Sequence, residues 1–290
     1  MPKNKGNIPV NSMDGNFSRG ISIDEISIRN SDFENEQQYA EATQSHRDEG
    51  HTFHIVLKGS VHIEIDFKMH EVTAPSVVYM HPNQVHRILD FKDITVCSLS
   101  ITNENLTAGY LKLLEEITPI EPLLLNDDDF SLISEATAIT LKYSKKTNDR
   151  LYHPILKDLA NALVALTISQ YLEQSGVKGK ISRPDAIYNA FRKALESGFM
   201  TIKGPTKYAT SLNISTAYLN ECVKGITGNS VTHHIQQRII LEAKRLLYHS
   251  DKSVKEIAYE LGYEDYPYFS RLFSNVTGMT ALDFRSKNRE

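Results

Sequence analysis

The sequence contains no tryptophan, only two cysteines and no apolar run of membrane-spanning length. Cys97 and Cys222 are far apart and each lies in an apolar pattern, so we expect reduced core thiols and no disulfide framework. No apolar run follows Lys3 and Lys5, which argues against a secretory signal. We therefore expect a cytoplasmic protein without a membrane partner.

A strong charge of one sign is also lacking, since the net charge of the chain is −4. The charges are nevertheless unevenly distributed. Residues 181–290 contain 15 lysines and arginines against 11 acidic residues, a net charge of +4, and residues 1–180 carry a net charge of −8. A polyanionic partner is therefore favoured for the C-terminal part only, although a surplus of this size is common in globular domains.

The first part of the chain has the pattern of a small β domain. Residues 1–19 are rich in Asn, Gly, Pro and Ser, and we expect a disordered arm there. Within residues 20–120, short runs such as ISIDEISI, FHIVLKG and SVVYMH alternate with turn residues, which predicts a small barrel or sandwich.

Helical periodicity follows this β region. Residues 121–175 are expected to be helical and to end in a long apolar helix over residues 153–174. That helix either packs entirely within its own domain or also mediates a homodimer. Residues 176–183 combine glycine with basic residues and are expected to form a linker to an all-α domain over residues 184–290. The fold class is thus α+β with two domains.

An internal repeat is the strongest signal in the sequence. YATSLNISTAYLNECVKGITG, from Tyr208, recurs as IAYELGYEDYPYFSRLFSNVTG, from Ile257. Each copy contains a small alanine, then Asn213 or Gly262 where a turn requires positive φ, then an amphipathic helix. In the second copy, the apolar face of that helix comprises Phe269, Leu272, Phe273 and Val276. Two helix-turn-helix units in tandem are predicted, and repeated αα-hairpins of a simple bundle are the disfavoured alternative.

Local signals mark the ends of these helices. Prolines that suit a first helical turn stand at Pro184, Pro205 and Pro267. Ser253 and Glu256 have the spacing of a capping box, while Gly228 and Gly278 can end helices in the left-handed conformation. Between the repeats, residues 231–248 predict one helix of about 18 residues and about 27 Å. Its length would place two recognition helices in successive major grooves of one duplex.

Residues 183–287 resemble the AraC/XylS family of bacterial transcription regulators. The resemblance is most specific between Ser253 and Arg285, in VKEIAYELGY, YFSRLF and VTGMTALDFR. It implies a transcriptional activator with double-stranded DNA and RNA polymerase as partners. It also implies recognition helices over Ser215–Ile226 and Asp265–Val276.

The resemblance further implies which side chains contact DNA. The matching positions are Thr216, Ala217, Tyr218, Asn220 and Glu221 in the first helix and Tyr266, Pro267, Tyr268 and Arg271 in the second. Glu221 departs from the family pattern, which often has a basic or neutral polar residue there. A carboxylate near phosphates is unfavourable unless it accepts a hydrogen bond from a cytosine amino group.

Seven of the eleven histidines fall in the β region, at His46, His51, His54, His62, His70, His81 and His86. The segments KGSVHIEIDFKMHEV and MHPNQVHRI resemble a cupin-like effector domain. The cupin metal-ligand set is incomplete, because His51 and His54 are three residues apart instead of two and the expected glutamate is missing. We therefore expect a small-molecule effector near His46, His54 and His86, of which His86 fits the cupin motif best, and no metal or cofactor. Metal binding and a purely structural dimer module are the disfavoured alternatives for this domain.

Two other functions remain as alternatives. A cupin-type metal-dependent enzyme with a helical appendage leaves the tandem repeat unexplained. An architectural DNA-binding protein explains the repeat but gives the β domain no task. The favoured hypothesis is a non-enzymatic, sequence-specific DNA-binding regulator controlled by an effector.

Overall fold

The structure is a computed structural model that describes residues 9–11, 20–29, 43–82, 84–117, 121–174 and 182–288. The chain divides into two compact units, one within residues 9–178 and one within residues 179–290. A mainly β unit followed by an all-α unit confirms the predicted α+β fold class. None of the described helices is long and apolar enough to span a lipid bilayer.

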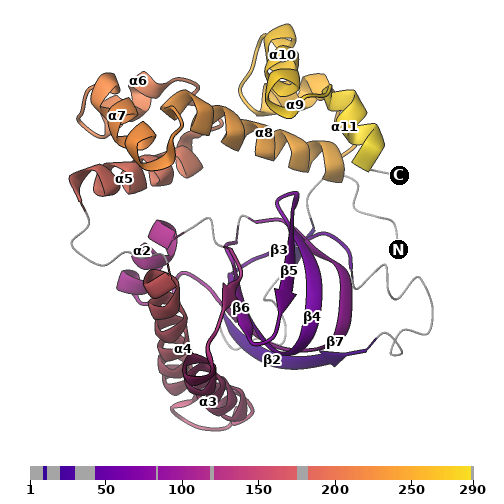
Figure 1. Cartoon of the computed structure of the whole chain (residues 1–290), viewed down its shortest axis with the longest axis vertical. Coiled ribbons are helices and arrows are strands. Elements are labelled where there is room, and N and C mark those ends of the chain that lie inside the picture. Colours follow the sequence, from indigo (N-terminus) through magenta and orange to yellow (C-terminus); the bar gives the residue numbers. More distant parts are fainter. Residues whose placement is uncertain are drawn as a thin grey trace. The chain divides into compact units, whose positions relative to one another are not determined.

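The N-terminal unit consists of strands followed by helices (Figure 1). Its elements are β1 (Val10–Asn11), β2 (Ile21–Ile28), β3 (Arg47–Asp48), β4 (His51–Ile65), β5 (Lys68–Thr73), β6 (Ser76–Met80), β7 (His86–Ile101), α2 (Ala108–Ile117), β8 (Leu123–Leu124), α3 (Asp127–Ser144) and α4 (Tyr152–Gln174). Six strands form one sheet in the order β2-β7-β4-β6-β8, with β5 also paired to β4, and β1 pairs with β3 in a separate parallel ribbon.

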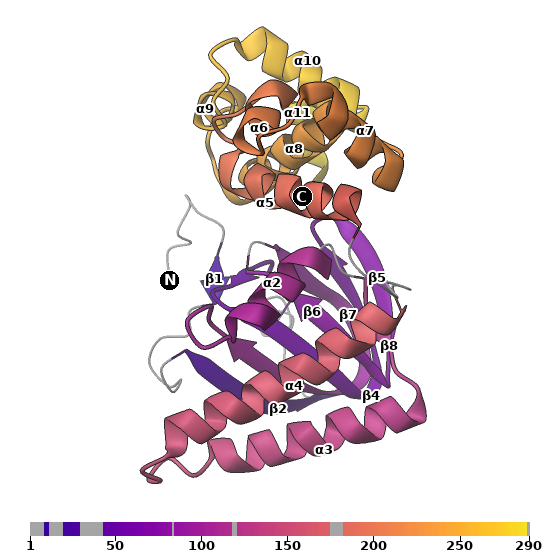
Figure 2. The same ribbon diagram turned by 90° about the vertical axis from the view of Figure 1, so that its left-hand side faces the viewer.

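Period-two alternation places two apolar clusters on opposite faces of the six-stranded sheet. Phe53 and Ile55 of β4 belong to a cluster shared with α2, α3 and α4, whereas Val56 belongs to a second cluster with Val78 and Met80 of β6. Figure 2 shows α3 and α4 side by side across the sheet face that carries the first cluster. The second cluster fills the other face of the sheet, on which the polar residues described below also lie.

The long helix predicted over residues 153–174 corresponds to α4. Most of its apolar side packs within its own domain, since Leu156, Leu163 and Ile168 are buried in the first cluster. Leu132 and Ile139, seven residues apart on α3, are instead 51% and 56% exposed. A dimer surface in the segment 121–175 would therefore draw on α3 as well as α4.

The C-terminal unit consists of seven described helices. They are α5 (Arg183–Gly198), α6 (Pro205–Ser211), α7 (Thr216–Thr227), α8 (Val231–His249), α9 (Val254–Glu260), α10 (Tyr266–Thr277) and α11 (Ala281–Asn288). The predicted prolines all occupy first-turn positions. The capping box of Ser253 and Glu256 is present, and Gly228 and Gly278 end α7 and α10 in the left-handed conformation, as predicted.

Two segments singled out in the sequence fall mostly outside the described residues. Of residues 1–19, expected to be a disordered arm, only 9–11 are described, and Val10 and Asn11 form β1. Of the expected linker 176–183, only the last two residues are described. Ser182 caps α5 through a reciprocal capping box with Asp185, and Arg183 begins that helix.

Candidate nucleic-acid interface and barrel site

The first helix-turn-helix unit comprises α6, a tight turn and α7. Asn213 in the turn adopts a φ of 54°, as the sequence predicts for this position. Ser215 then caps α7 by accepting a hydrogen bond from the backbone N–H of Tyr218. The buried face of α7 comprises Leu219, Cys222 and Val223. The opposite face of α7 is left for contacts outside the unit.

The second unit repeats this arrangement with α9 and α10. Gly262 adopts a φ of 78° in the turn, and Asp265 caps α10. A side chain at Gly262 would also collide with the backbone carbonyl of Met200, so this position requires glycine for two reasons. Phe269, Leu272 and Phe273 of the predicted packing face are buried, and the fourth predicted residue, Val276, is half-buried.

The five positions predicted to face DNA in the first unit differ in accessibility. Ala217 and Glu221 are exposed, whereas Thr216, Tyr218 and Asn220 are half-buried. Asn220 has an internal partner, because its Oδ1 accepts a hydrogen bond of 3.0 Å from the backbone N–H of Val231. The guanidinium of Arg183 lies 5.9 Å from the centre of the Tyr218 ring. Within α7, Ala217 and Glu221 are thus the most available of the five.

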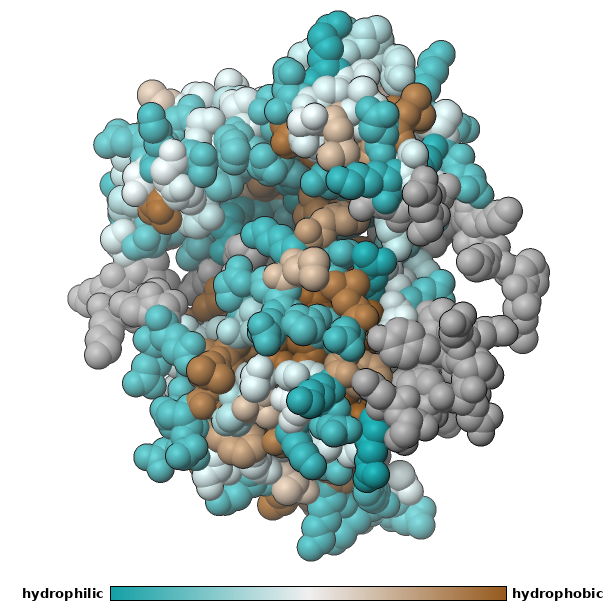
Figure 3. Space-filling view, turned by 45° about the vertical axis from the view of Figure 1, so that its right-hand side comes forward, coloured by the Kyte–Doolittle hydropathy of each residue, from teal (hydrophilic) through white to brown (hydrophobic). Residues whose placement is uncertain are grey.

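The positions in the second unit are more open. Pro267, Tyr268 and Arg271 are exposed, and Tyr266 is half-buried. The Tyr268 ring stacks on that of Tyr263, with centroids 5.9 Å apart. On the face shown in Figure 3, the helical unit, at the top as in Figure 1, presents mainly hydrophilic side chains. α10 therefore offers a rigid aromatic and cationic surface to a ligand.

Arg271 has no hydrogen bond or ion pair within the described part of the chain. The two carboxylates of α9 that could have engaged it have other partners. Glu260 lies 2.6 Å from Nζ of Lys252, and Glu256 accepts a hydrogen bond of 2.7 Å from the backbone N–H of Ser253. The guanidinium is consequently available for a polyanion.

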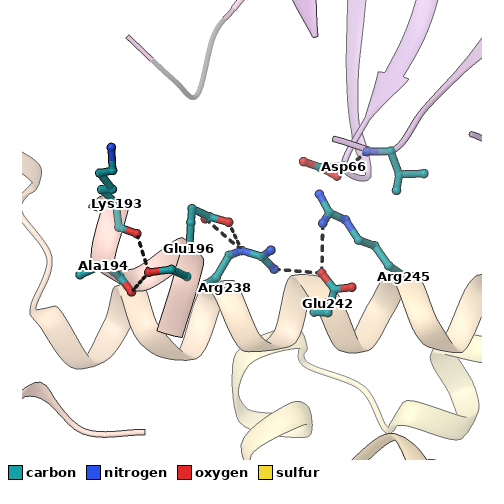
Figure 4. A network of polar contacts seen from close by, with 9 residues as sticks. Asp66, Lys193, Ala194, Glu196, Arg238, Glu242 and Arg245 are labelled. Atoms are coloured by element: carbon teal, nitrogen blue, oxygen red, sulfur yellow. Dashed lines mark hydrogen bonds and ion pairs between the residues drawn. The ribbon is translucent and has the colours of Figure 1, made fainter. Parts of the chain in front are cut away.

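A network of ion pairs links α5 to α8 (Figure 4). Nε of Arg238 donates to Glu196 at 2.8 Å, and its Nη1 donates to Glu242 at 3.0 Å. Arg245 donates to the same Glu242 oxygen at 3.1 Å. Burial alone would raise the pKa of Glu242, but Arg245 and Arg238 outweigh it and lower this pKa. The network holds α5 against α8, the helix that connects both units.

In the N-terminal unit, the structure brings together the three histidines predicted as effector contacts. The backbones of His46 and His86 pair through two hydrogen bonds of 3.0 and 2.9 Å. Their ring centroids lie 4.4 Å apart, and the His54 ring is 6.2 Å from that of His86. Burial lowers the pKa of His86 to about 3 and also lowers the pKa of His54. Both imidazoles are therefore neutral at pH 7.

Asp48, which the sequence analysis did not single out, completes this group. Its carboxylate oxygens lie 3.8 Å from Nε2 of His46 and 3.8 Å from Nε2 of His86. Thr52, Ser98 and Ser100 add hydroxyls on the neighbouring strands, where Nδ1 of His54 lies 2.8 Å from Oγ of Ser98. The result is a polar site of imidazole, carboxylate and hydroxyl groups.

Other histidines of the β region have separate roles. His51 is buried, with Nε2 donating to Asn103 at 2.8 Å, so its Nδ1 accepts from the Tyr79 hydroxyl at 2.6 Å. His62 and His70 lie beside Asp90 and Glu121, respectively, at 3.7 and 3.0 Å. These residues do not join the group around His86.

A separate cavity of about 430 Å³ lies between the sheet and α3. Leu57 and Leu141 supply apolar lining, and Glu25, Lys142 and Lys145 supply charge. No histidine lines it, so it is distinct from the polar site.

Two protein-family models match the chain in sequence order. One, described as an AraC-like ligand binding domain, matches residues 34–151. The other, described as a helix-turn-helix domain, matches residues 208–287. The first match spans β3 to α3 of the β unit, and the second runs from within α6 to α11.

Several similar proteins are regulators by name. The chain is 30% identical over 106 residues to the HTH-type transcriptional activator RhaR of Enterobacter sp. (strain 638), covering 37% of this chain and 36% of that protein. It is 36% identical over 84 residues to the MmsAB operon regulatory protein of Pseudomonas aeruginosa, covering 29% and 27%. These matches thus span about a third of each relative. RhaR of Mannheimia succiniciproducens is 21% identical over 252 residues, covering 83% and 87%.

Among solved structures, apo ToxT from Vibrio cholerae is 14% identical with a TM-score of 0.42, covering 93% of this chain and 98% of that one. The C-terminal domain of AraT from Geobacillus stearothermophilus is 25% identical with a TM-score of 0.34, covering 38% and 88%. The order and extent of the two family matches lead to one assignment: this chain belongs to the AraC family, with an AraC-like ligand binding domain followed by a helix-turn-helix domain.

Proposed function

We propose that the protein is a sequence-specific DNA-binding transcription regulator that inserts α7 and α10 into successive major grooves of one duplex. The observation that carries the proposal is the pair of helix-turn-helix units, each of which buries one face of its recognition helix and leaves the other exposed. In such units the free face reads base edges while surrounding groups contact phosphates.

The connection between the units supports this docking. α8 has 19 residues and therefore a length of about 28 Å. This length approaches the 34–36 Å or so that separates equivalent major-groove sites one helical turn apart. Asn220 attaches α7 to the start of α8 and the Arg238 network attaches α5 to α8, which favours a fixed position of the first recognition helix on the connecting helix. The unit's net positive charge favours the polyanion.

We further propose that the β unit binds a small-molecule effector at the polar site of His46, His54 and His86. Convergent polar groups beside an apolar cluster are a common feature of ligand sites, and this sheet face combines both. The match to an AraC-like ligand binding domain supports the same assignment.

Activation of transcription through RNA polymerase is proposed from the RhaR relatives, whose names describe them as transcriptional activators. A homodimer is proposed through the segment 121–175, where Leu132 and Ile139 expose apolar surface. A second chain would raise the effective concentration at neighbouring DNA sites. The place of action would be the cytoplasm, where bacterial DNA lies. An enzymatic role is not proposed, because it gives the tandem units no task.

Selection from a pool of randomised DNA duplexes tests the proposal. The full chain is expected to enrich sites with two short motifs whose centres lie about 10–10.5 base pairs apart. A variant with Phe269→Ala, which removes a fully buried ring of the second unit, should enrich only the motif read by the first. Failure of the unaltered chain to enrich any motif would contradict sequence-specific binding.

A further inference from the structure

Three side chains from two segments far apart in the sequence converge in the β unit. His46 precedes β3, Asp48 ends β3 and His86 begins β7. One ligand atom from each lies within 4.8 Å of the others. The two histidine-to-carboxylate distances, both 3.8 Å, are too long for hydrogen bonds. They are within a few tenths of an ångström of the roughly 3.0–3.5 Å that separates neighbouring ligand atoms around one ion with bonds of about 2.0–2.2 Å.

The hydrogen bonding of His46 determines which atom faces the carboxylate. Nδ1 of His46 lies 2.9 Å from the backbone carbonyl oxygen of Gln44. A carbonyl oxygen can only accept, so Nδ1 carries the proton and the neutral ring presents the lone pair of Nε2 to Asp48. Ligating histidines are commonly oriented by such a hydrogen bond from the other ring nitrogen. Two electron-rich atoms, Nε2 of His46 and a carboxylate oxygen of Asp48, therefore face each other. A cation between them would remove their mutual repulsion.

The burial and the hydrogen bonding of Asp48 and His86 also favour a bound cation. Oδ2 of Asp48 is buried and has no hydrogen-bond partner among the described residues. A buried carboxylate oxygen without a partner is costly, and a bound cation removes that cost. The His86 side chain is only 5% exposed, and its Nε2 is the atom nearest to this oxygen. Two imidazole nitrogens and one carboxylate suit a divalent transition metal, whereas Mg²⁺ and Ca²⁺ prefer sets made of oxygen alone.

We propose that His46, Asp48 and His86 bind one divalent transition-metal ion of the Zn²⁺ or Co²⁺ type. Three protein ligands leave at least one coordination position open to water or to an oxygen of another molecule. The site differs from the cupin pattern considered in the sequence, because Asp48 supplies the carboxylate in place of the missing glutamate. It concerns the β unit alone and does not depend on DNA binding.

The test uses the full chain, stripped of metal with a chelator and then titrated with Co²⁺. The expected result is visible d–d absorption that saturates at one ion per chain and is displaced by Zn²⁺. Asp48→Asn retains the shape of the side chain. This variant and His86→Ala each remove a proposed ligand, so each should weaken binding by more than the roughly 10–100-fold that the loss of an outer-shell partner costs. His62→Ala is the matched control, because His62 also lies beside a carboxylate, that of Asp90, but outside the site. It should bind as the unaltered chain does.

Circular dichroism of the metal-free proteins verifies that each variant is folded. If Asp48→Asn fails to fold, His46→Gln, at the more accessible edge of the site, replaces it with the same expected loss. The proposal is overturned if the unaltered chain takes up no Co²⁺ or Zn²⁺. It is equally overturned if folded ligand variants bind the ion as tightly as His62→Ala does. Neither result would bear on DNA binding, which is measured separately.

Discussion

The ammonium group of Lys203, between α5 and α6, donates a hydrogen bond to the backbone carbonyl of Leu261 at the end of α9, so one side chain joins the α5–α6 connection to the second helix-turn-helix unit. The same nitrogen donates to the carbonyls of Phe199 and Met200 at 2.7 and 2.8 Å, at the end of α5. It also lies 4.9 Å from the centre of the Tyr263 ring, in the turn that precedes α10. The turn of the second unit is thereby attached to the end of α5.

Replacing Lys203 with methionine should destabilise this attachment. Methionine retains much of the apolar stem but donates no hydrogen bond, and three carbonyls lose a charged donor. We expect the free energy of unfolding in urea to fall by about 1.5–3 kcal/mol. Lys207→Met, an exposed position on α6, is the control and should change stability little. Equal stability of the two variants would show that the attachment contributes nothing.

Asn220→Ala should act mainly on stability, although the family resemblance places Asn220 among the DNA contacts. Its Oδ1 satisfies the N–H of Val231 at the start of α8, a group that has no partner within the helix. The loss should be about 1 kcal/mol in urea unfolding. Asn220→Asp retains the acceptor and should retain stability. If Asn220→Ala is as stable as the parent but loses preference at one base pair, the side chain reads DNA instead.

Acid should weaken the C-terminal unit through Glu242. Because Arg245 and Arg238 lower its pKa below the usual 4.5, the unfolded chain takes up this proton first as the pH falls. The stabilisation is therefore complete above about pH 4.5 and is lost as the pH falls through the lower pKa of the folded state. Urea unfolding at a series of pH values should show this loss in the parent and a smaller pH dependence in Glu242→Gln. Identical pH profiles would contradict the assignment.

Glu221→Gln tests the exposed carboxylate on α7. If Glu221 only repels phosphates, the variant should bind all duplexes more tightly and show a steeper salt dependence. If it accepts from a cytosine amino group, the variant should lose about 1–3 kcal/mol on the selected site alone. Fluorescence anisotropy with the selected and scrambled duplexes separates these results. Unchanged binding to both would place Glu221 outside the interface.

Much of the helical unit could be predicted because its signals are local. Ser253 with Glu256, Gly278 and the helical periodicity around Phe269 each act within a few residues, and the glycine and the periodicity recur in the first copy. The role of Asn220 could not be predicted, because its partner Val231 lies beyond the end of the same helix. Lys203 and Leu261 are 58 residues apart, and no periodicity connects them.

In the β unit, too, contacts between residues far apart in the sequence could not be predicted. The sequence singled out the histidines because seven of the eleven fall in the β region. The structure does bring the rings of His46, His54 and His86 together. Asp48 was missed because its place beside His86 depends on the backbone pairing of His46 with His86, which are far apart in the sequence. The sequence also predicts that the apolar residues of α4 lie on a helix. It does not indicate how many of them pack against the sheet of the same unit.

The central claim, that α10 docks on DNA through its exposed face, is tested most directly by titrating Arg271→Ala against the selected duplex and a scrambled one at two salt concentrations. Lys287→Ala, which removes an exposed charge from α11, is the matched control and should bind nearly as the parent does. If Arg271 pairs with a guanine, its loss should cost about 1–3 kcal/mol on the selected duplex only. If it contacts a phosphate, both duplexes should weaken and the salt slope should fall by about one. A folded Arg271→Ala protein that binds both duplexes as the parent does would contradict this docking and leave recognition to the first unit.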